Sequence, residues 1–148
     1  MAKQKLITLS LCVALLFGAS ACASLEIQNV DYAQPVESVL TVDQNNEVHD
    51  QRYAIKFSIT PVLEEEEVAS VDAIRLIRNN AGYYFLTASG FGNVYVFEPN
   101  EGSLKLETTI EIPGEALGQP AFNQRGGHIE LVDLATGRSF NLDQNGRR

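Results

Sequence analysis

The sequence predicts an all-β protein with one antiparallel domain, built as a small sandwich, a barrel or a blade-like meander. Residues 53–60 alternate apolar and polar side chains, which is the period of a strand with one buried face. Beyond residue 73, apolar segments come in pairs that short Asn- and Gly-containing sequences separate. Turn sequences at this spacing are typical of sandwiches, barrels and meanders.

Taken in chain order, the first element is a polar turn over residues 43–47, which read DQNNE. It has the carboxylates of a calcium loop at its start but not the glycine and the second glutamate that such a loop needs. The strand over residues 53–60 follows. Residues 63–73 are left open between one short helix and an extended segment. Their glutamates favour a helix, whereas their apolar residues do not gather on one helical stripe.

Three hairpins are predicted after this segment. Asn and Gly tolerate positive φ, so their presence between apolar segments indicates tight turns. The hairpins pair residues 74–77 with 83–87 around RNNAG, 93–97 with 104–108 around EPNEG, and 129–134 with 138–142 around ATG.

The N-terminal segment has the layout of a bacterial secretory signal. Lys3 and Lys5 precede an uncharged apolar run over residues 6–17, and small residues follow it. The run is shorter than the roughly 20 residues that a membrane-spanning helix needs. A cleaved signal peptide over residues 1–21 is therefore predicted.

The cleavage region reads Ala19-Ser20-Ala21-Cys22, which resembles the lipobox of bacterial lipoproteins. In that family the signal is cut just before the cysteine, and a diacylglycerol is attached to its sulfur. Ala19 departs from the family, which usually has a larger aliphatic residue there. The resemblance implies cleavage between Ala21 and Cys22 and a lipid on Cys22. Cys12 leaves with the signal, so Cys22 is the single cysteine that remains, at the position where lipidation needs it.

Two further inferences concern location. No Asp follows Cys22, and by resemblance to Gram-negative lipoproteins this implies an outer-membrane anchor that faces the periplasm, if the host is Gram-negative. The same small residues also satisfy an ordinary signal peptidase site. A periplasmic or secreted β domain without a lipid is therefore the alternative.

Charge restricts the partners of the mature chain. Residues 22–36 are predicted to be a lipidated N-terminus and tether, and residues 37–148 the β domain. Because Lys3 and Lys5 leave with the signal, 9 basic residues face 19 acidic ones, a formal net charge of −10. Such a chain repels nucleic acid and anionic lipid headgroups. We expect no nucleic-acid partner, and attachment to the membrane through the lipid alone.

The second half of the chain also resembles a β-propeller blade. Residues 83–112 read YYFLTASGFGNVYVFEPNEGSLKLETTIEI, and residues 128–142, HIELVDLATGRSFNL, repeat the last part. The resemblance covers about half of the mature chain. A closed propeller needs four or more blades, for which this chain alone has no room. The resemblance therefore implies a blade-like antiparallel meander.

Aromatic residues are dense between residues 83 and 97. Alternate residues of adjacent strands share a face, so half of them are expected in the core and half, with Tyr84 and Tyr95 among them, at the surface. Core or edge packing is the default interpretation of these aromatics, and an exposed binding patch is the alternative. The candidate binding patch consists of Tyr84, Ser89, Gly90, Phe91, Gly92 and Tyr95.

Nothing in the sequence combines into a catalytic or metal site. His49 and His128 lie far apart and are predicted to be solvated loop residues. Ser89 lacks the glycine pattern of a nucleophile elbow, and the glycines beside it open a strand, not the helix of a phosphate loop. The glutamates of residues 64–67 are predicted to be a solvated acidic run. We therefore predict no enzyme, no cofactor and no metal.

These observations together predict a membrane-anchored envelope lipoprotein that acts as a non-enzymatic adaptor for another envelope protein. The alternatives are a small-ligand-binding or inhibitor module that uses the loop at residues 89–92, and an enzyme with an unrecognised site. An exposed aromatic strip without a cleft would favour the adaptor. A pocket with converging polar groups would favour the ligand-binding module.

Overall fold

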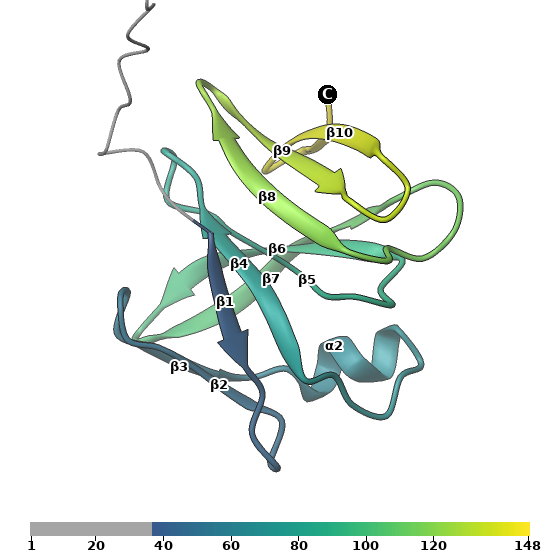
Figure 1. The fold of residues 1–148 in the computed structure, drawn as a ribbon. Helices are drawn as coiled ribbons and strands as arrows, with labels where there is room; N and C mark the ends of the chain where they lie inside the picture. Colours follow the sequence, from purple (N-terminus) through teal and green to yellow (C-terminus); the bar gives the residue numbers. More distant parts are fainter. Residues whose placement is uncertain (1–36) are drawn as a thin grey trace, which may run out of the picture. The chain divides into compact units, whose positions relative to one another are not determined.

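The computed structural model describes residues 37–148 (Figure 1). The predicted signal peptide, Cys22 and the tether over residues 22–36 lie outside the described residues. Across residues 37–148, no helix is long and apolar enough to cross a bilayer.

Three antiparallel sheets make up the described part of the chain, which confirms the all-β prediction. The five-stranded sheet has the order β1 (Ser38–Thr41), β4 (Ala73–Arg78), β5 (Tyr84–Thr87), β6 (Asn93–Asn100), β7 (Ser103–Glu111). The four-stranded sheet has the order β11 (Gly146–Arg147), β10 (Arg138–Asp143), β9 (His128–Asp133), β8 (Pro120–Arg125). A ribbon of β2 (Glu47–Asp50) and β3 (Ile55–Ser58) precedes the short helix α2 (Thr60–Glu65).

The central strands of the five-stranded sheet are buried on both faces, and this is the feature that organises the domain. Along β5, Tyr84 and Leu86 point to one core while Phe85 points to the other, so every residue of this strand is buried. On β6, Tyr95 belongs to the same core as Tyr84 and Leu86, and Val94 to the same core as Phe85. Successive side chains of a strand point to opposite faces, and here both faces are covered.

Each face has its own cover. The ribbon β2–β3 and α2 cover one face and contribute Val48, Phe57 and Leu63 to its core. The four-stranded sheet covers the other face through side chains such as Ile129 and Leu131. In Figure 1 the five-stranded sheet lies between the green-to-yellow sheet and the blue-to-teal layer of β2, β3 and α2.

All three predicted hairpins are present: β4 pairs with β5, β6 with β7, and β9 with β10. The second is longer and tighter than predicted, because its strands extend to Asn100 and Ser103. Glu101 and Gly102 form the turn with φ values of 47° and 82°. Two successive residues at positive φ are what a two-residue hairpin turn requires, because this backbone twist matches that of the strands.

The segment that the sequence left open contains a helix, but an earlier one than residues 63–73. The helix α2 begins at Thr60 and ends at Glu65. Pro61 occupies its first turn, where a missing N–H has no intrahelical partner to lose. Glu67 has a φ of 56°, which ends the helix. Val62 and Leu63 are buried against the core, so packing rather than glutamate propensity sets its position.

The strand predicted over residues 53–60 is shorter in the structure. Ala54 has a φ of 53°, so the extended backbone begins only at Ile55. The alternation of buried and exposed residues along β3 is as predicted. The polar turn at residues 43–47 is also present. One carboxylate oxygen of Asp43 accepts hydrogen bonds from the N–H groups of Asn45 and Glu47, each at 2.8 Å.

Candidate functional site

The predicted aromatic patch is not at the surface. Tyr84 is 4% exposed, and Phe91 and Tyr95 are fully buried. The alternative in which Tyr84 and Tyr95 are exposed is therefore wrong, and the default interpretation of core packing holds for these aromatics. The reason is that both faces of the five-stranded sheet are covered, so neither choice of face leads to solvent.

Ring contacts explain how these aromatics pack. Tyr84 meets Tyr53 edge to face at 5.3 Å between ring centroids, and Phe91 meets Tyr95 in the same way at 6.2 Å. Edge-to-face pairs are favourable because the positive rim of one ring meets the negative face of the other. The two pairs lie on the face that the ribbon and α2 cover.

Of the six residues predicted for the patch, Ser89 and Gly90 are exposed. The Ser89 hydroxyl donates to the carbonyl of Gly118 at 2.6 Å, and the Gly90 N–H donates to the carbonyl of Leu117 at 2.7 Å. Gly90 has a φ of 89°, a backbone conformation that favours glycine. The Gly-rich loop is thus fastened to the segment that leads into β8.

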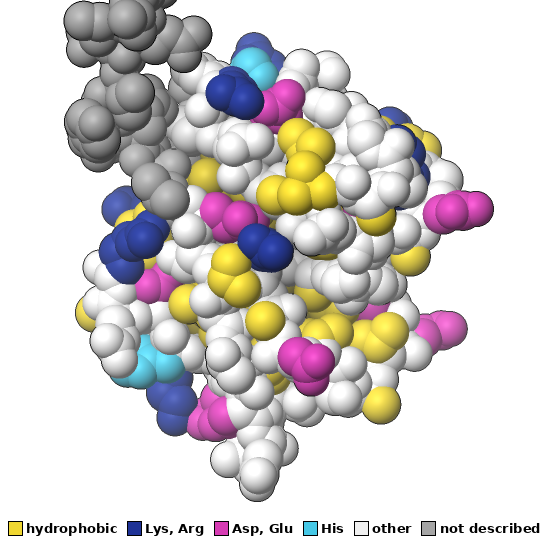
Figure 2. All heavy atoms as spheres, in the orientation of Figure 1, with side chains coloured by type: hydrophobic (Ala, Val, Ile, Leu, Met, Phe, Trp, Pro, Cys, Tyr) yellow, Lys and Arg dark blue, Asp and Glu magenta, His cyan; other side chains and the backbone are white. Residues whose placement is uncertain are grey.

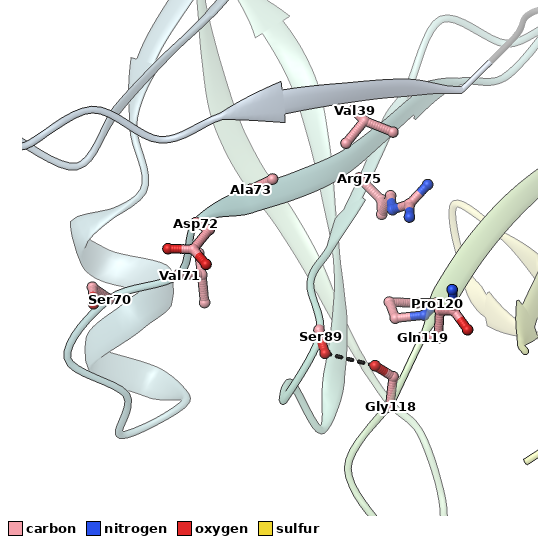
Figure 3. A pocket seen from close by; sticks show the side chains of 10 residues that line it. All are labelled: Val39, Ser70, Val71, Asp72, Ala73, Arg75, Ser89, Gly118, Gln119 and Pro120. Carbon is pink, nitrogen blue, oxygen red and sulfur yellow. Dashed lines mark hydrogen bonds between the residues drawn. The ribbon is translucent and has the colours of Figure 1, made fainter. Parts of the chain in front are cut away.

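That fastening closes one side of a cleft of about 480 Å³ (Figure 3). Val39 of β1 and Ala73 and Arg75 of β4 line the side of the cleft that belongs to the five-stranded sheet. Ser89 stands opposite on the Gly-rich loop. The remaining lining residues are Ser70, Val71 and Asp72 from the loop after α2, Gly118 and Gln119 from the segment that leads into β8, and Pro120, the first residue of β8. The lining mixes short polar and apolar side chains and contains no aromatic ring.

Glu37 joins the two large sheets beside this cleft. One oxygen of its carboxylate accepts from the guanidinium of Arg75 at 3.0 Å, and the other accepts from the N–H of Phe122 at 2.9 Å. Arg75 belongs to the five-stranded sheet, and Phe122 to β8 at the edge of the four-stranded sheet. The N–H of Phe122 points away from β9 and does not take part in the β8–β9 ladder, so it is free to donate to Glu37.

Asp133 holds the opposite wall of the cleft. It lies at the end of β9 on the inward side of the strand and is fully buried. Its carboxylate accepts from the N–H of Gln119 and the hydroxyl of Thr136, both at 2.8 Å, and pairs with Arg138 at 3.3 Å. Arg138 also donates to the carbonyls of Pro113 and Glu115, each at 2.8 Å. One ion pair therefore orders the loop that leads to β8.

These contacts lower the pKa of Asp133 far below its usual range. The N–H of Gln119 contributes most, and Thr136 and Arg138 add to it, while burial acts in the opposite direction. The carboxylate is therefore ionised at every pH at which the protein is expected to function. It is a structural anion, because all of its described neighbours are donors of the same domain.

Glu66 fastens the Gly-rich loop from the other side. Its carboxylate accepts from the N–H groups of Gly92 at 2.7 Å and Asn93 at 3.1 Å, and from the hydroxyl of Tyr95 at 2.9 Å. Burial, followed by this bond to Glu66, raises the pKa of Tyr95. The prediction of a solvated acidic run over residues 64–67 is therefore wrong for Glu66. No local sequence signal identifies it, because its partners lie 26 to 29 residues further along the chain.

A test of the cleft wall uses Gly118, which lies against the turn after β9. A Cβ atom at this position would lie 2.7 Å from the Cβ of Ala135. We expect Gly118→Ala to lower the free energy of unfolding by about 1 to 3 kcal/mol, because the overlap forces the turn to shift. Denaturant unfolding measures this loss. Ala135→Gly in the same chain removes the overlapping atom and should restore most of the stability. A double variant as unstable as the single one would contradict this account.

Other predicted site residues do not gather into chemistry. His49 and His128 lie on β2 and β9, not in the loops where they were predicted. Within residues 37–148, no three His, Cys, Asp or Glu side chains lie together as a metal site requires. On the face shown in Figure 2, hydrophobic side chains form small groups between polar and charged ones. The large hydrophobic residues that are exposed are Val39, Leu106 and Leu134.

Comparison of the chain with family models, with curated proteins and with solved structures found no match. The function is therefore inferred from the residues of this chain alone.

Proposed function

We propose that the chain is a lipid-anchored, non-enzymatic binding module of the bacterial cell envelope that engages another envelope protein. The anchor is supported by the sequence. An apolar run after Lys3 and Lys5 leads to small residues and to Cys22, the one cysteine left after cleavage. The lipid anchor and the partner are each tested by a separate experiment.

The observation that carries the binding role is the cleft between β1, β4 and the start of β8. Pockets for small ligands are mostly apolar and aromatic and enclose most of the ligand. Here every aromatic side chain predicted for the site lies in the core, and the lining of the cleft contains no aromatic ring. Two edge strands, β1 and β8, border it. A cleft of this kind fits a segment of another protein better than a small molecule.

Binding of a small polar ligand remains the second candidate, and one observation favours it. Arg75, Asp72 and Ser89 all line the same cleft (Figure 3). Such a group can hydrogen-bond a polar molecule. Ser89 and Arg75 already have partners within the domain, the carbonyl of Gly118 and the carboxylate of Glu37. A small ligand would have to replace those bonds, which makes the protein partner the better proposal.

The anchor is tested by Cys22→Ser. We expect the wild-type chain in the membrane fraction and the variant in the soluble fraction, because a chain without lipid has only a repelling charge of −10 toward anionic headgroups. Cys12→Ser is the matched control. It also removes a thiol, but one that leaves with the signal, so this variant should stay in the membrane fraction. Membrane attachment of Cys22→Ser equal to wild type would overturn the lipid anchor.

The partner is tested by photo-crosslinking in cells with the full chain. A photoreactive residue replaces Gln119, which is exposed and lines the cleft. The control position is Leu106, which is 43% exposed on β7, at the other edge of the five-stranded sheet. One discrete protein captured from position 119 and not from 106 supports the proposal. Equal capture from both positions, or none from either, would contradict it.

A further inference from the structure

The strand β1 has a free backbone edge. The N–H of Val42 donates to the carbonyl of Asp72 at 3.0 Å, directly beyond the β1–β4 ladder. In an antiparallel pair, bonded and non-bonded positions alternate. Leu40 therefore bonds to β4, whereas the N–H and C=O groups of Val39 and Thr41 point away from it. Among residues 37–148, these outward groups have no backbone partner.

The far side of β4 confirms this alternation. The N–H of Asn79 donates to the carbonyl of Tyr83 at 2.9 Å, so the bonded positions toward β5 are Ile77 and Arg75. Ile74 and Leu76 are then left for β1, opposite Leu40 and Ser38. Both hydrogen-bond patterns therefore show that Ser38 and Leu40 bond to β4. The N–H and C=O groups of Val39 and Thr41 face the outer edge of β1.

The edge of β1 also lacks the protection that the other edge strands carry. Free edges invite pairing with other chains, and proteins usually blunt them with charged residues or proline. In the described part of the chain, β1 is the one edge strand without a charged residue or proline. The protecting residues elsewhere are Lys105 and Glu107 on β7, Pro120 and Arg125 on β8, Arg147 on β11, Glu47 and Asp50 on β2, and Lys56 on β3.

Hollows lie on both sides of this edge. Between β1 and β2 are two grooves of about 380 Å³ and 300 Å³, and the cleft of about 480 Å³ lies across β1 from them. All three are lined by Val39, which is 55% exposed. A strand added to β1 would direct alternate side chains to the two faces of the sheet. Pairing of the main chain with pockets for alternate side chains is how added strands are recognised.

One buried carboxylate oxygen in the grooves selects the added segment. Carboxylates of Asp43, Glu47 and Asp50 line the grooves, together with the basic side chains of Arg52 and Lys56. Glu47 is paired with Lys56 at 2.7 Å. One oxygen of Asp50 accepts from the N–H of Arg52 at 2.8 Å, but the other is buried without a hydrogen-bond partner within residues 37–148. Asp50 as a whole is 2% exposed. A buried carboxylate oxygen is costly to leave unpaired, and a cationic side chain would satisfy it.

We propose that the partner adds an extended segment as a further strand on the free edge of β1, and that this segment carries a lysine or arginine directed to Asp50. The inference rests on the proposed function, since it says how the envelope partner is held. A second copy of this chain is a poorer occupant, because two domains with this excess of acidic residues repel each other.

The first test measures amide hydrogen exchange in the purified full mature chain. The probe is a short peptide that alternates valine and lysine, and the control peptide has glutamate in place of lysine. We expect the valine–lysine peptide to slow exchange at Val39 and Thr41 about tenfold or more, the equivalent of one added hydrogen bond. Leu40 is already protected by β4 and should not change. Unchanged exchange at Val39 and Thr41 with the lysine peptide, or equal slowing with both peptides, would overturn the proposal.

The second test uses the natural partner in cells. A photoreactive residue at Gln51, which is exposed and lines the larger groove, is combined with Val39→Pro or Val39→Ala. Proline removes the outward N–H, and an edge strand tolerates it where that N–H faces solvent. We expect capture of the partner to fall about tenfold with proline and to change little with alanine. Exchange protection at Leu40 shows whether the proline variant keeps β1 in the sheet.

The outcomes separate the two proposals. If Val39→Pro captures the partner as well as Val39→Ala does, strand addition is wrong while the binding role stands. If position 51 captures a second copy of this chain, the occupant is wrong. If neither position 51 nor position 119 captures any protein, the binding role itself fails.

Discussion

Replacing Asp133 with alanine is expected to lower the free energy of unfolding by about 3 to 5 kcal/mol, the usual cost of removing one partner of a buried ion pair. The substitution removes the anionic partner of Arg138 and leaves the N–H of Gln119 without its acceptor. It also releases the loop that Arg138 holds through the carbonyl of Pro113. Equilibrium denaturant unfolding measures the loss.

Asp143→Ala provides the matched control. This aspartate lies in the same sheet, but it is partly exposed, its ion pair with Arg148 is 3.4 Å long, and it accepts one backbone bond, from Asn145. We expect a loss of about 1 kcal/mol or less, as for other partly exposed pairs. If the two substitutions lower the stability equally, the buried contacts of Asp133 do not contribute as described.

The same residue sets the acid sensitivity of the fold. The N–H of Gln119 and the other donors hold the pKa of Asp133 below its value in the unfolded chain, which is about 3.9. The stabilisation is therefore fully present above about pH 4 and is lost as pH falls from there toward the folded-state pKa. Asp133→Asn removes the titrating group. Unfolding measured at neutral and at acidic pH should show a smaller fall in stability for this variant than for the wild type, and an equal fall would contradict the assignment.

Replacing Glu66 with alanine is expected to lower the free energy of unfolding by about 2 to 4 kcal/mol, because several donors lose a charged acceptor at once. The N–H groups of Gly92 and Asn93 turn to solvent or stay unpaired, and the buried hydroxyl of Tyr95 has nowhere else to donate within the described contacts. Thermal and denaturant unfolding measure the loss. Glu64→Ala is the control, because Glu64 belongs to the same acidic run and is exposed. It should change stability by about 0.5 kcal/mol or less.

A double-mutant cycle identifies the contact responsible. Tyr95→Phe removes only the hydroxyl, and its cost should overlap with that of Glu66→Ala, since both break the same 2.9 Å bond. We expect the double variant to be more stable than the sum of the two losses predicts. Strict additivity would show that the tyrosine and the glutamate do not interact in solution.

The strands were predictable because their signals are local. Pairs of apolar segments around Asn- and Gly-containing turns define β4 with β5, β6 with β7, and β9 with β10, and each hairpin is found in the structure. The ribbon of β2 and β3 was only half predicted, because β2 has the sequence EVHD and carries almost no apolar signal. Its position follows from the core that Val48 helps to close.

The exposure of the aromatics was mispredicted although a signal was present. β5 reads YFLT, with no charged residue, and the centre of β6 reads VYVF. An uninterrupted apolar strand indicates burial on both faces, whereas alternation indicates burial on one. Exposure of Tyr84 and Tyr95 would require a sheet that is covered on one face only. The cover on the second face comes from the ribbon and α2, which the sequence did not place there.

The three carboxylates around the cleft could not be found from the sequence. Glu37, Glu66 and Asp133 each accept backbone N–H groups from segments 14 to 85 residues away. Such contacts depend on the finished packing of the sheets. A run of glutamates therefore gives no indication of which member accepts such bonds, and Glu66 differs from Glu64 only in where the end of α2 directs it.

The position of Glu37 has a mechanical consequence. If Cys22 carries the lipid, tension between the membrane and a protein held on the domain enters the fold at its N-terminal end. Among the described residues, the load first meets Glu37, which is attached to β4 through Arg75 and to β8 through Phe122. Pulling is therefore shared between both large sheets before the hydrogen bonds of β1 begin to open one by one. Glu37 would thus distribute a pulling force over the two large sheets and protect the β1–β4 hydrogen bonds from bearing it alone.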